Sequence, residues 1–134
     1  MATHLILHFD GGSRGNPGPG YGSYHLSRGG EVIRLRHLRL GPWMTNNEAE
    51  YEALIAGLNE ALGWLERQGL DPKAEAIEVR GDSQLVIRQL QGAWKAREPR
   101  MAALRDRALA LLRRFGRYTL RQVPRARSVE LLGH

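Results

Sequence analysis

Three acidic side chains in this sequence could bind a divalent cation together, and two of them follow short apolar runs. Asp10 follows the run 3–9, and Asp82 follows the run 76–79 after Arg80 and Gly81. If both runs are parallel neighbouring strands, the two carboxylates meet at one edge of a sheet, where α/β folds place their sites. Two adjacent carboxylates repel each other unless a cation binds between them, and Mg²⁺ prefers such oxygen ligands. The pair therefore predicts a metal site, with a helix N-cap for Asp82 and a turn residue for Asp10 as structural alternatives.

A third acid comes from the helix that is predicted to open at Thr45, which carries Glu48, Glu50 and Glu52. At about 100° per residue, Glu50 lies roughly 40° from Leu54 and therefore within the apolar stripe of the helix, whereas Glu48 and Glu52 lie roughly 120° and 160° away. An acid that points inward needs a partner, so Glu50 is expected to join the metal site. Glu48 has capping-box spacing from Thr45, which gives it a structural role.

The elements that must position these acids follow from the periodicity of the apolar residues. Strands are expected over residues 3–9, 21–26, 31–38, 76–79 and 118–123. Helices are expected from Thr45 to the break at Gly69, over 82–90 and over 99–115, with a helical stub after Pro124. The glycine-rich stretch 11–20 reads as a tight loop. The order predicts an α/β fold in which the second and third strands form a hairpin and the first, fourth and fifth run parallel.

Composition limits the classes of protein. The 134 residues suit one domain, and 42% hydrophobic and 25% charged residues are typical of globular chains. The absence of cysteine excludes disulfides and thiolate metal sites. No apolar run approaches the roughly 20 residues that span a bilayer, and the N-terminus lacks a signal-peptide pattern, so a cytoplasmic protein without membrane contact is expected.

Positive charge is concentrated near the C-terminus. The net charge is +6, and residues 95–127 carry eleven Lys or Arg against two acids, Glu98 and Asp106. Such a block predicts a polyanionic partner such as nucleic acid, and a solvated helix face is the alternative.

Three segments of the chain resemble the core motifs of type 1 ribonuclease H. They are F-D-G-G-S-R-G-N-P-G-P-G (9–20), T-N-N-E-A-E-Y-E-A-L (45–54) and G-D-S-Q-L-V (81–86). The resemblance implies a ribonuclease H-like fold, a five-stranded mixed sheet flanked by helices, with residues 1–134 as a single catalytic domain. It implies an endoribonuclease that hydrolyses the RNA strand of RNA–DNA hybrids with two Mg²⁺ ions, or Mn²⁺ as a substitute, and leaves 5′-phosphate and 3′-hydroxyl ends.

The resemblance also implies roles for individual residues. Asp10, Glu50 and Asp82 match three catalytic, metal-binding carboxylates of the family. The residues expected to touch the hybrid are Gly11, Gly12, Asn16, Thr45, Asn46, Asn47, Gln84 and Arg125. The asparagines and Gln84 match positions in the minor groove, where the 2′-hydroxyl marks the RNA strand. Helix capping is the alternative role for Asn46 and Asn47.

The C-terminal segment departs from the family pattern. The family usually carries a fourth catalytic Asp in its last helix, and here V-E-L-L-G (129–133) occupies that place, so Glu130 is the candidate fourth metal ligand. An exposed terminal Glu is the alternative. Many members have a histidine in the preceding loop, where this chain has Arg125. The basic protrusion of some members is missing, and Arg97 and Arg100 are best placed to substitute for it.

Two other functions fit the same residues. One is an enzyme of this fold that also acts on double-stranded RNA, since side chains that contact a 2′-hydroxyl group could also bind an RNA duplex. The other is a non-catalytic hybrid-binding module whose fourth carboxylate has been lost, against which the three retained acids argue. A monomer is expected, because nothing in the sequence points to an oligomer.

Overall fold

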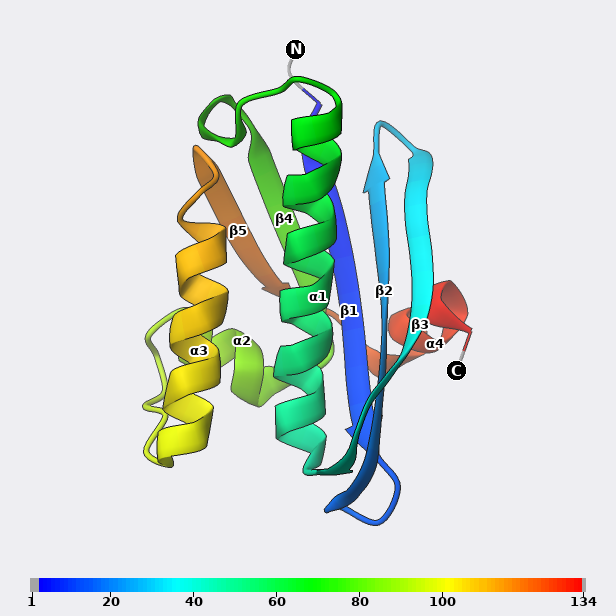
Figure 1. Cartoon of the computed structure of the whole chain (residues 1–134), viewed down its shortest axis with the longest axis vertical. Helices are drawn as coiled ribbons and strands as arrows, with labels where there is room; N and C mark the ends of the chain where they lie inside the picture. Colours follow the sequence, from blue (N-terminus) through cyan, green and yellow to red (C-terminus); the bar gives the residue numbers. More distant parts are fainter. Residues whose placement is uncertain (1–2, 134) are drawn as a thin grey trace.

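The sheet of this protein has the strand order β3-β2-β1-β4-β5 in a computed structural model that describes residues 3–133 (Figure 1). The strands are β1 (Leu5–Ser13), β2 (Gly18–Arg28), β3 (Glu31–Met44), β4 (Ala76–Gly81) and β5 (Arg117–Gln122). β1 pairs antiparallel with β2 and parallel with β4, and β4 pairs parallel with β5. The predicted mixed sheet, with a hairpin beside three parallel strands, is confirmed.

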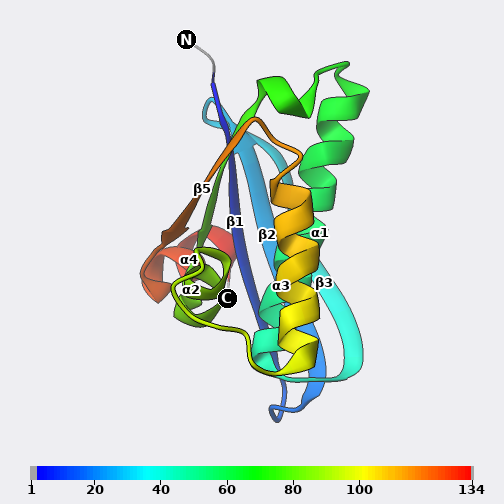
Figure 2. The ribbon, with the colours of Figure 1, turned by 90° about the vertical axis from the view of Figure 1, so that its left-hand side faces the viewer.

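Helices cover both faces of the sheet. They are α1 (Asn46–Arg67), α2 (Gln84–Leu90), α3 (Pro99–Leu112) and α4 (Arg125–Leu132), with a short 3-10 turn at Pro72–Ala74. Figure 2 shows α1 and α3 on one side of the sheet and α4 on the other, where it packs on β1 and β2. Within residues 3–133, every helix is too short or too polar to cross a membrane.

The main core lies between α1 and the centre of the sheet. Leu7 and Phe9 of β1 are fully buried against the apolar stripe of α1, which includes Leu54 and Leu58. Gly57 allows this close approach, since a Cβ there would lie 2.7 Å from a methyl carbon of Leu7. The packing of α1 on β1 therefore fixes where the first turns of the helix meet the strand.

The connection between β1 and β2 differs from its prediction. β1 continues to Ser13 and β2 begins at Gly18, so the expected loop 11–20 is reduced to a turn at residues 14–17. Gly11 pairs with Gly22 in the ladder, and a Cβ on Gly11 would lie 2.4 Å from the carbonyl oxygen of Ala49. Gly11 is therefore a strand residue whose missing side chain lets the α1 backbone contact β1. The glycine-rich pattern predicted a loop here. β3 is also longer than predicted, and most other element ends shift by up to three residues.

Candidate metal centre and nucleic-acid interface

Three carboxylates converge at the end of the parallel strands, as the sequence predicted. Ligand oxygens of Asp10, Glu50 and Asp82 all lie within 4.8 Å of one another. The last parallel pair joins Phe9 of β1 to Gly81 of β4, and Asp10 and Asp82 each follow directly. Asp10 was predicted to end its strand, but β1 continues to Ser13. Asp10 lies level with the end of β4, which stops at Gly81. The register of two strands therefore brings the two acids together.

The start of α1 brings Glu50 to the same point. Thr45 caps the helix: its hydroxyl accepts a 3.2 Å hydrogen bond from the Glu48 backbone N–H, and a Glu48 carboxylate oxygen accepts one of 3.0 Å from the Thr45 backbone N–H. This reciprocal cap confirms the structural role predicted for Glu48. Glu50 is only 8% exposed, as its place in the apolar stripe predicted.

The electrostatics of the cluster favour a cation. Burial and the negative charges of Asp10 and Asp82 raise the pKa of Glu50 to about 9. Burial and Asp10 also raise the pKa of Asp82, while Arg125 opposes that shift. The Glu50 Oε2 atom is buried and has no hydrogen-bond partner within residues 3–133. A buried acceptor without a donor, among three converging carboxylates, fits a hard divalent cation such as Mg²⁺ or Mn²⁺.

Asp82 is not the cap of α2. Ser83 occupies that position, and its hydroxyl accepts a 3.3 Å hydrogen bond from the Val86 backbone N–H. The structural alternative for Asp82 is therefore wrong. Instead, Asp82 Oδ2 accepts a 3.2 Å hydrogen bond from Arg125 Nη1. Arg125, predicted to bind substrate, thus lies beside the carboxylates.

Glu130 is the predicted ligand that the structure does not bring to the cluster. The residues of α4 that face the sheet are Ser128 and Leu132, which are fully buried, whereas Glu130 is exposed. Glu130 is two residues from each, about 200° around the helix, and so points away from the sheet. Its proposed role as fourth carboxylate stays a prediction.

The asparagines tie the turn after β1 to the start of α1. The backbone N–H of Asn46 donates a 2.9 Å hydrogen bond to Asn16 Oδ1, and Asn46 Oδ1 accepts a 2.8 Å hydrogen bond from the Ser13 backbone N–H. Asn46 therefore has a structural role, although Thr45 is the cap. Asn47 and Gln84 are exposed in the first turns of α1 and α2. Contacts of these residues with nucleic acid stay predictions.

One anchor of the site was missed from the sequence. The ring nitrogen His8 Nε2 lies 2.8 Å from Ser128 Oγ in a buried hydrogen bond that attaches α4 to β1. Burial and the charge of Arg80 lower the pKa of His8 to about 4, so its ring is neutral near pH 7. Ser128 had no sequence signal, since its partner is 120 residues away.

The basic block is partly neutralised. Arg100 pairs with Glu48 at 2.6 Å, and Arg107 pairs with Glu52 at 3.1 Å. Part of the block is therefore a solvated, ion-paired helix face, which was the alternative interpretation of its charge.

Comparison with known proteins agrees with this geometry. Residues 9–130 match the family described as reverse transcriptase-like. The chain is 44% identical over 120 residues to ribonuclease HI of Halobacterium salinarum. The aligned residues make up 89% of this chain and 56% of that relative. The chain thus spans just over half the length of this relative.

Solved structures extend the likeness to the whole fold. The crystal structure of RNase H1 from Halobacterium salinarum NRC-1 matches with a TM-score of 0.83 and 40% identity, over 96% of this chain and 90% of that one. LC11-RNase H1, solved in complex with an RNA/DNA hybrid, matches with a TM-score of 0.82 and 30% identity, over 95% of this chain and 90% of that one. Both matches confirm the predicted fold.

Proposed function

Since this chain belongs to the ribonuclease H family, we propose that it is an endonuclease that hydrolyses the RNA strand of RNA–DNA hybrids. The observation that carries the proposal is the convergence of Asp10, Glu50 and Asp82 within 4.8 Å. A module that only binds hybrids has no need of three buried or half-buried acids whose mutual repulsion destabilises the fold. The hybrid in the LC11-RNase H1 complex supports the choice of substrate.

The carboxylates would hold two Mg²⁺ ions, with Mn²⁺ as a substitute. When bound, these ions supply activation of the attacking water and stabilisation of the leaving 3′-oxygen, which gives 5′-phosphate and 3′-hydroxyl products. The raised pKa of Glu50 means that the metal-free site holds a proton near neutral pH. Glu50 has to lose this proton before it serves as a ligand.

Other residues would position the hybrid. Arg125 lies 3.2 Å from Asp82 and is 68% exposed at its side chain, so it can turn to a phosphate near the cut. The exposed amides of Asn16, Asn47 and Gln84 stand at the turn after β1 and at two helix starts, where they would read the minor groove. Gly11, Gly12, Thr45 and Asn46 complete the proposed contact set. We place the whole activity in a single domain formed by residues 1–134.

The test uses end-labelled RNA in three forms: paired with DNA, paired with RNA and single-stranded. Each form is incubated with Mg²⁺ or Mn²⁺, and the Asp10→Asn variant serves as control. Cleavage of the hybrid with 5′-phosphate ends supports the proposal. Equal cleavage of the RNA duplex would extend the substrate to double-stranded RNA, and a hybrid that is bound but never cut would leave the binding-module alternative.

A further inference from the structure

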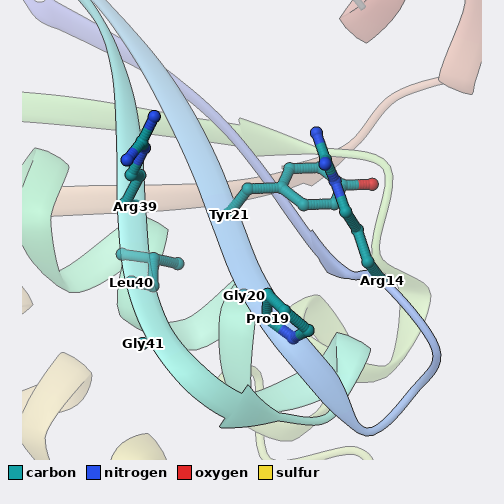
Figure 3. Close-up of a pocket in the computed structure, with 7 residues that line it drawn as sticks. All are labelled: Arg14, Pro19, Gly20, Tyr21, Arg39, Leu40 and Gly41. Carbon is teal, nitrogen blue, oxygen red and sulfur yellow. The ribbon is translucent and has the colours of Figure 1, made fainter.

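A pocket of about 540 Å³ opens on the part of the sheet formed by β2 and β3, next to the turn that follows β1 (Figure 3). Arg14 lines it from the turn after β1, Tyr21 from β2 and Arg39 from β3. Its volume lies in the range of small-ligand sites. None of these three residues belongs to the metal cluster or to the contact set proposed above.

An irregular stretch of strand pairing builds this pocket. The register between β2 and β3 shifts on both sides of Gly20, immediately before Tyr21. Such bulges change the direction of the following side chain and are common next to active sites. Tyr21 lies opposite Arg39 on one neighbouring strand and opposite Gly12 on the other. The tyrosine therefore connects the pocket to the strand that carries Asp10.

The Tyr21 ring lies over Gly12. A Cβ on Gly12 would be 2.6 Å from the Tyr21 hydroxyl oxygen and 2.8 Å from its Cζ, so glycine at position 12 leaves room for the ring in this position. With 39% of its surface exposed, Tyr21 still presents part of the ring to the pocket. A partly exposed aromatic ring held on the backbone is suited to stacking with a planar base.

The charge of the pocket is positive and has no internal counter-ion. Within residues 3–133, neither Arg14 nor Arg39 forms an ion pair, whereas Arg100, Arg107 and Arg125 each pair with a carboxylate. Both side chains belong to exposed residues. Two such guanidinium groups in one pocket with an aromatic ring are complementary to a nucleotide, which has an anionic phosphate and a flat base.

We propose that this pocket binds one nucleotide of a single-stranded extension of the substrate, with its phosphate at Arg14 and Arg39 and its base on Tyr21. The nucleotide has to be single-stranded, because a base within a duplex is already stacked on its neighbours. Gly12, over which the Tyr21 ring lies, is two residues from Asp10, about 7 Å along β1, so the tyrosine side of the pocket is close to the metal cluster. The inference rests on the proposed function and adds a preference for hybrids with single-stranded flanks.

The test measures hybrid binding by fluorescence anisotropy in EDTA, so that nothing is cleaved. A blunt hybrid is compared with the same hybrid carrying a short extension, in separate arms for RNA and for DNA and for each end. At least one arm is expected to bind roughly fivefold or more tightly than the blunt hybrid, given the strength of base–aromatic stacking. The arm that gains affinity identifies the strand.

Variants connect that gain to the pocket. Tyr21→Leu and Arg39→Gln are expected to remove the gain and leave blunt-hybrid affinity unchanged, while Tyr21→Phe keeps it. Arg114→Gln, which removes the same charge from an exposed site at the end of α3, is the matched control and keeps the gain. Equal affinities for blunt and extended hybrids, or variants that weaken both alike, would overturn the proposal.

Isolated single-stranded RNA and DNA oligonucleotides separate this inference from the proposed function. Binding of a single strand that is lost in Tyr21→Leu and Arg39→Gln supports the pocket even if the hybrid is never cleaved. Failure of the protein to bind any single strand overturns the pocket, even if hybrid cleavage is observed. Melting temperatures of all variants verify folding, and Arg39→Gln decides the matter if Tyr21→Leu does not fold.

Discussion

The guanidinium of Arg125 donates a 3.2 Å hydrogen bond to Asp82 Oδ2 and so links the last helix to the acidic cluster. In the absence of an ion, this positive charge stabilises the ionised form of Asp82 against burial and against Asp10, which both raise its pKa. Arg125 therefore takes part of the role of a cation and competes with one for the same oxygen.

The first prediction concerns this competition. Arg125→Gln is expected to tighten Mg²⁺ or Mn²⁺ binding in the absence of substrate by a factor on the order of three, since the Arg125 side chain is largely exposed and solvent screens its charge. The same variant is expected to bind hybrid less tightly. Isothermal titration with each ion measures the effect, with Arg127→Gln on the same helix as control. Weaker ion binding would show instead that Arg125 holds Asp82 in position.

The second prediction concerns the ligands themselves. Asp10→Asn, Glu50→Gln and Asp82→Asn are each expected to lower single-turnover cleavage by more than about 100-fold, because even residues behind a metal's ligands change activity by 10–100-fold. Hybrid binding should remain measurable. Glu52→Gln is the control, since Glu52 lies on α1 and pairs with Arg107 outside the cluster. A variant of the cluster that keeps full activity would remove that residue from the site.

The third prediction follows from the pKa of Glu50, which folding raises from 4.5 to about 9. Between these values the folded chain holds a proton that the unfolded chain has lost. The contribution of Glu50 to the free energy of unfolding is therefore most favourable below pH 4.5 and declines as the pH rises toward 9. In EDTA, Glu50→Gln should melt a few degrees above the parent protein near pH 9 and show no such advantage near pH 4.5.

Thermal melts across this pH range verify the effect of Glu50, and Glu52→Gln again serves as control. Added Mg²⁺ should raise the melting temperature of the parent protein at high pH more than that of Glu50→Gln. Curves for the two proteins that stay parallel at every pH would contradict the raised pKa.

The fourth prediction separates Glu130 from the three converging acids. Because Glu130 is exposed and lies on the outer side of α4, Glu130→Gln is expected to lower cleavage by less than roughly tenfold, a smaller loss than that expected for a ligand. The rates are compared in the same single-turnover assay. A loss as large as that of Asp10→Asn would mean that α4 reorients when metal and hybrid bind.

The fifth prediction concerns the backbone contact beneath the site. Gly11→Ala places a Cβ 2.4 Å from the Ala49 carbonyl oxygen and is expected to destabilise the protein by about 1–3 kcal/mol. Gly63→Ala is the matched control. Its Cβ would meet only the flexible end of Arg67, at 3.3 Å, and alanine favours the helix by about 1 kcal/mol. Urea unfolding measures both, and an unaffected Gly11→Ala would show that α1 can move away from β1.

Local rules were sufficient where a residue and its partner are close in sequence. The capping of α1 by Thr45 and Glu48 was correctly predicted from spacing, and the inward direction of Glu50 from helical geometry. The metal cluster needed one further step, the parallel pairing of two apolar runs. These rules are reliable because the hydrogen bonds and side-chain directions that they describe are set within a few residues.

The features that were missed depend on distant parts of the chain. β1 continues through Gly11 and Gly12 because α1 packs on its backbone, and rules based on neighbouring residues take no account of a distant helix. The pocket at Tyr21 depends on a bulge between two strands, which the apolar pattern does not mark. The link from Arg125 to Asp82 depends on where α4 docks, through Ser128 and His8.

The contact between Gly11 and Ala49 has a consequence for how the site responds to denaturation. Asp10 and Glu50 are the neighbours of these two residues, so the separation of their Cα atoms is set by two main chains in contact. The packing of α1 on β1 therefore offsets the repulsion between the two carboxylates, and the carboxylates are close together before an ion binds. Ion affinity and the docking of α1 are therefore thermodynamically coupled. Fraying of the first turns of the helix should abolish ion binding, and a bound ion should slow hydrogen exchange of the α1 amides.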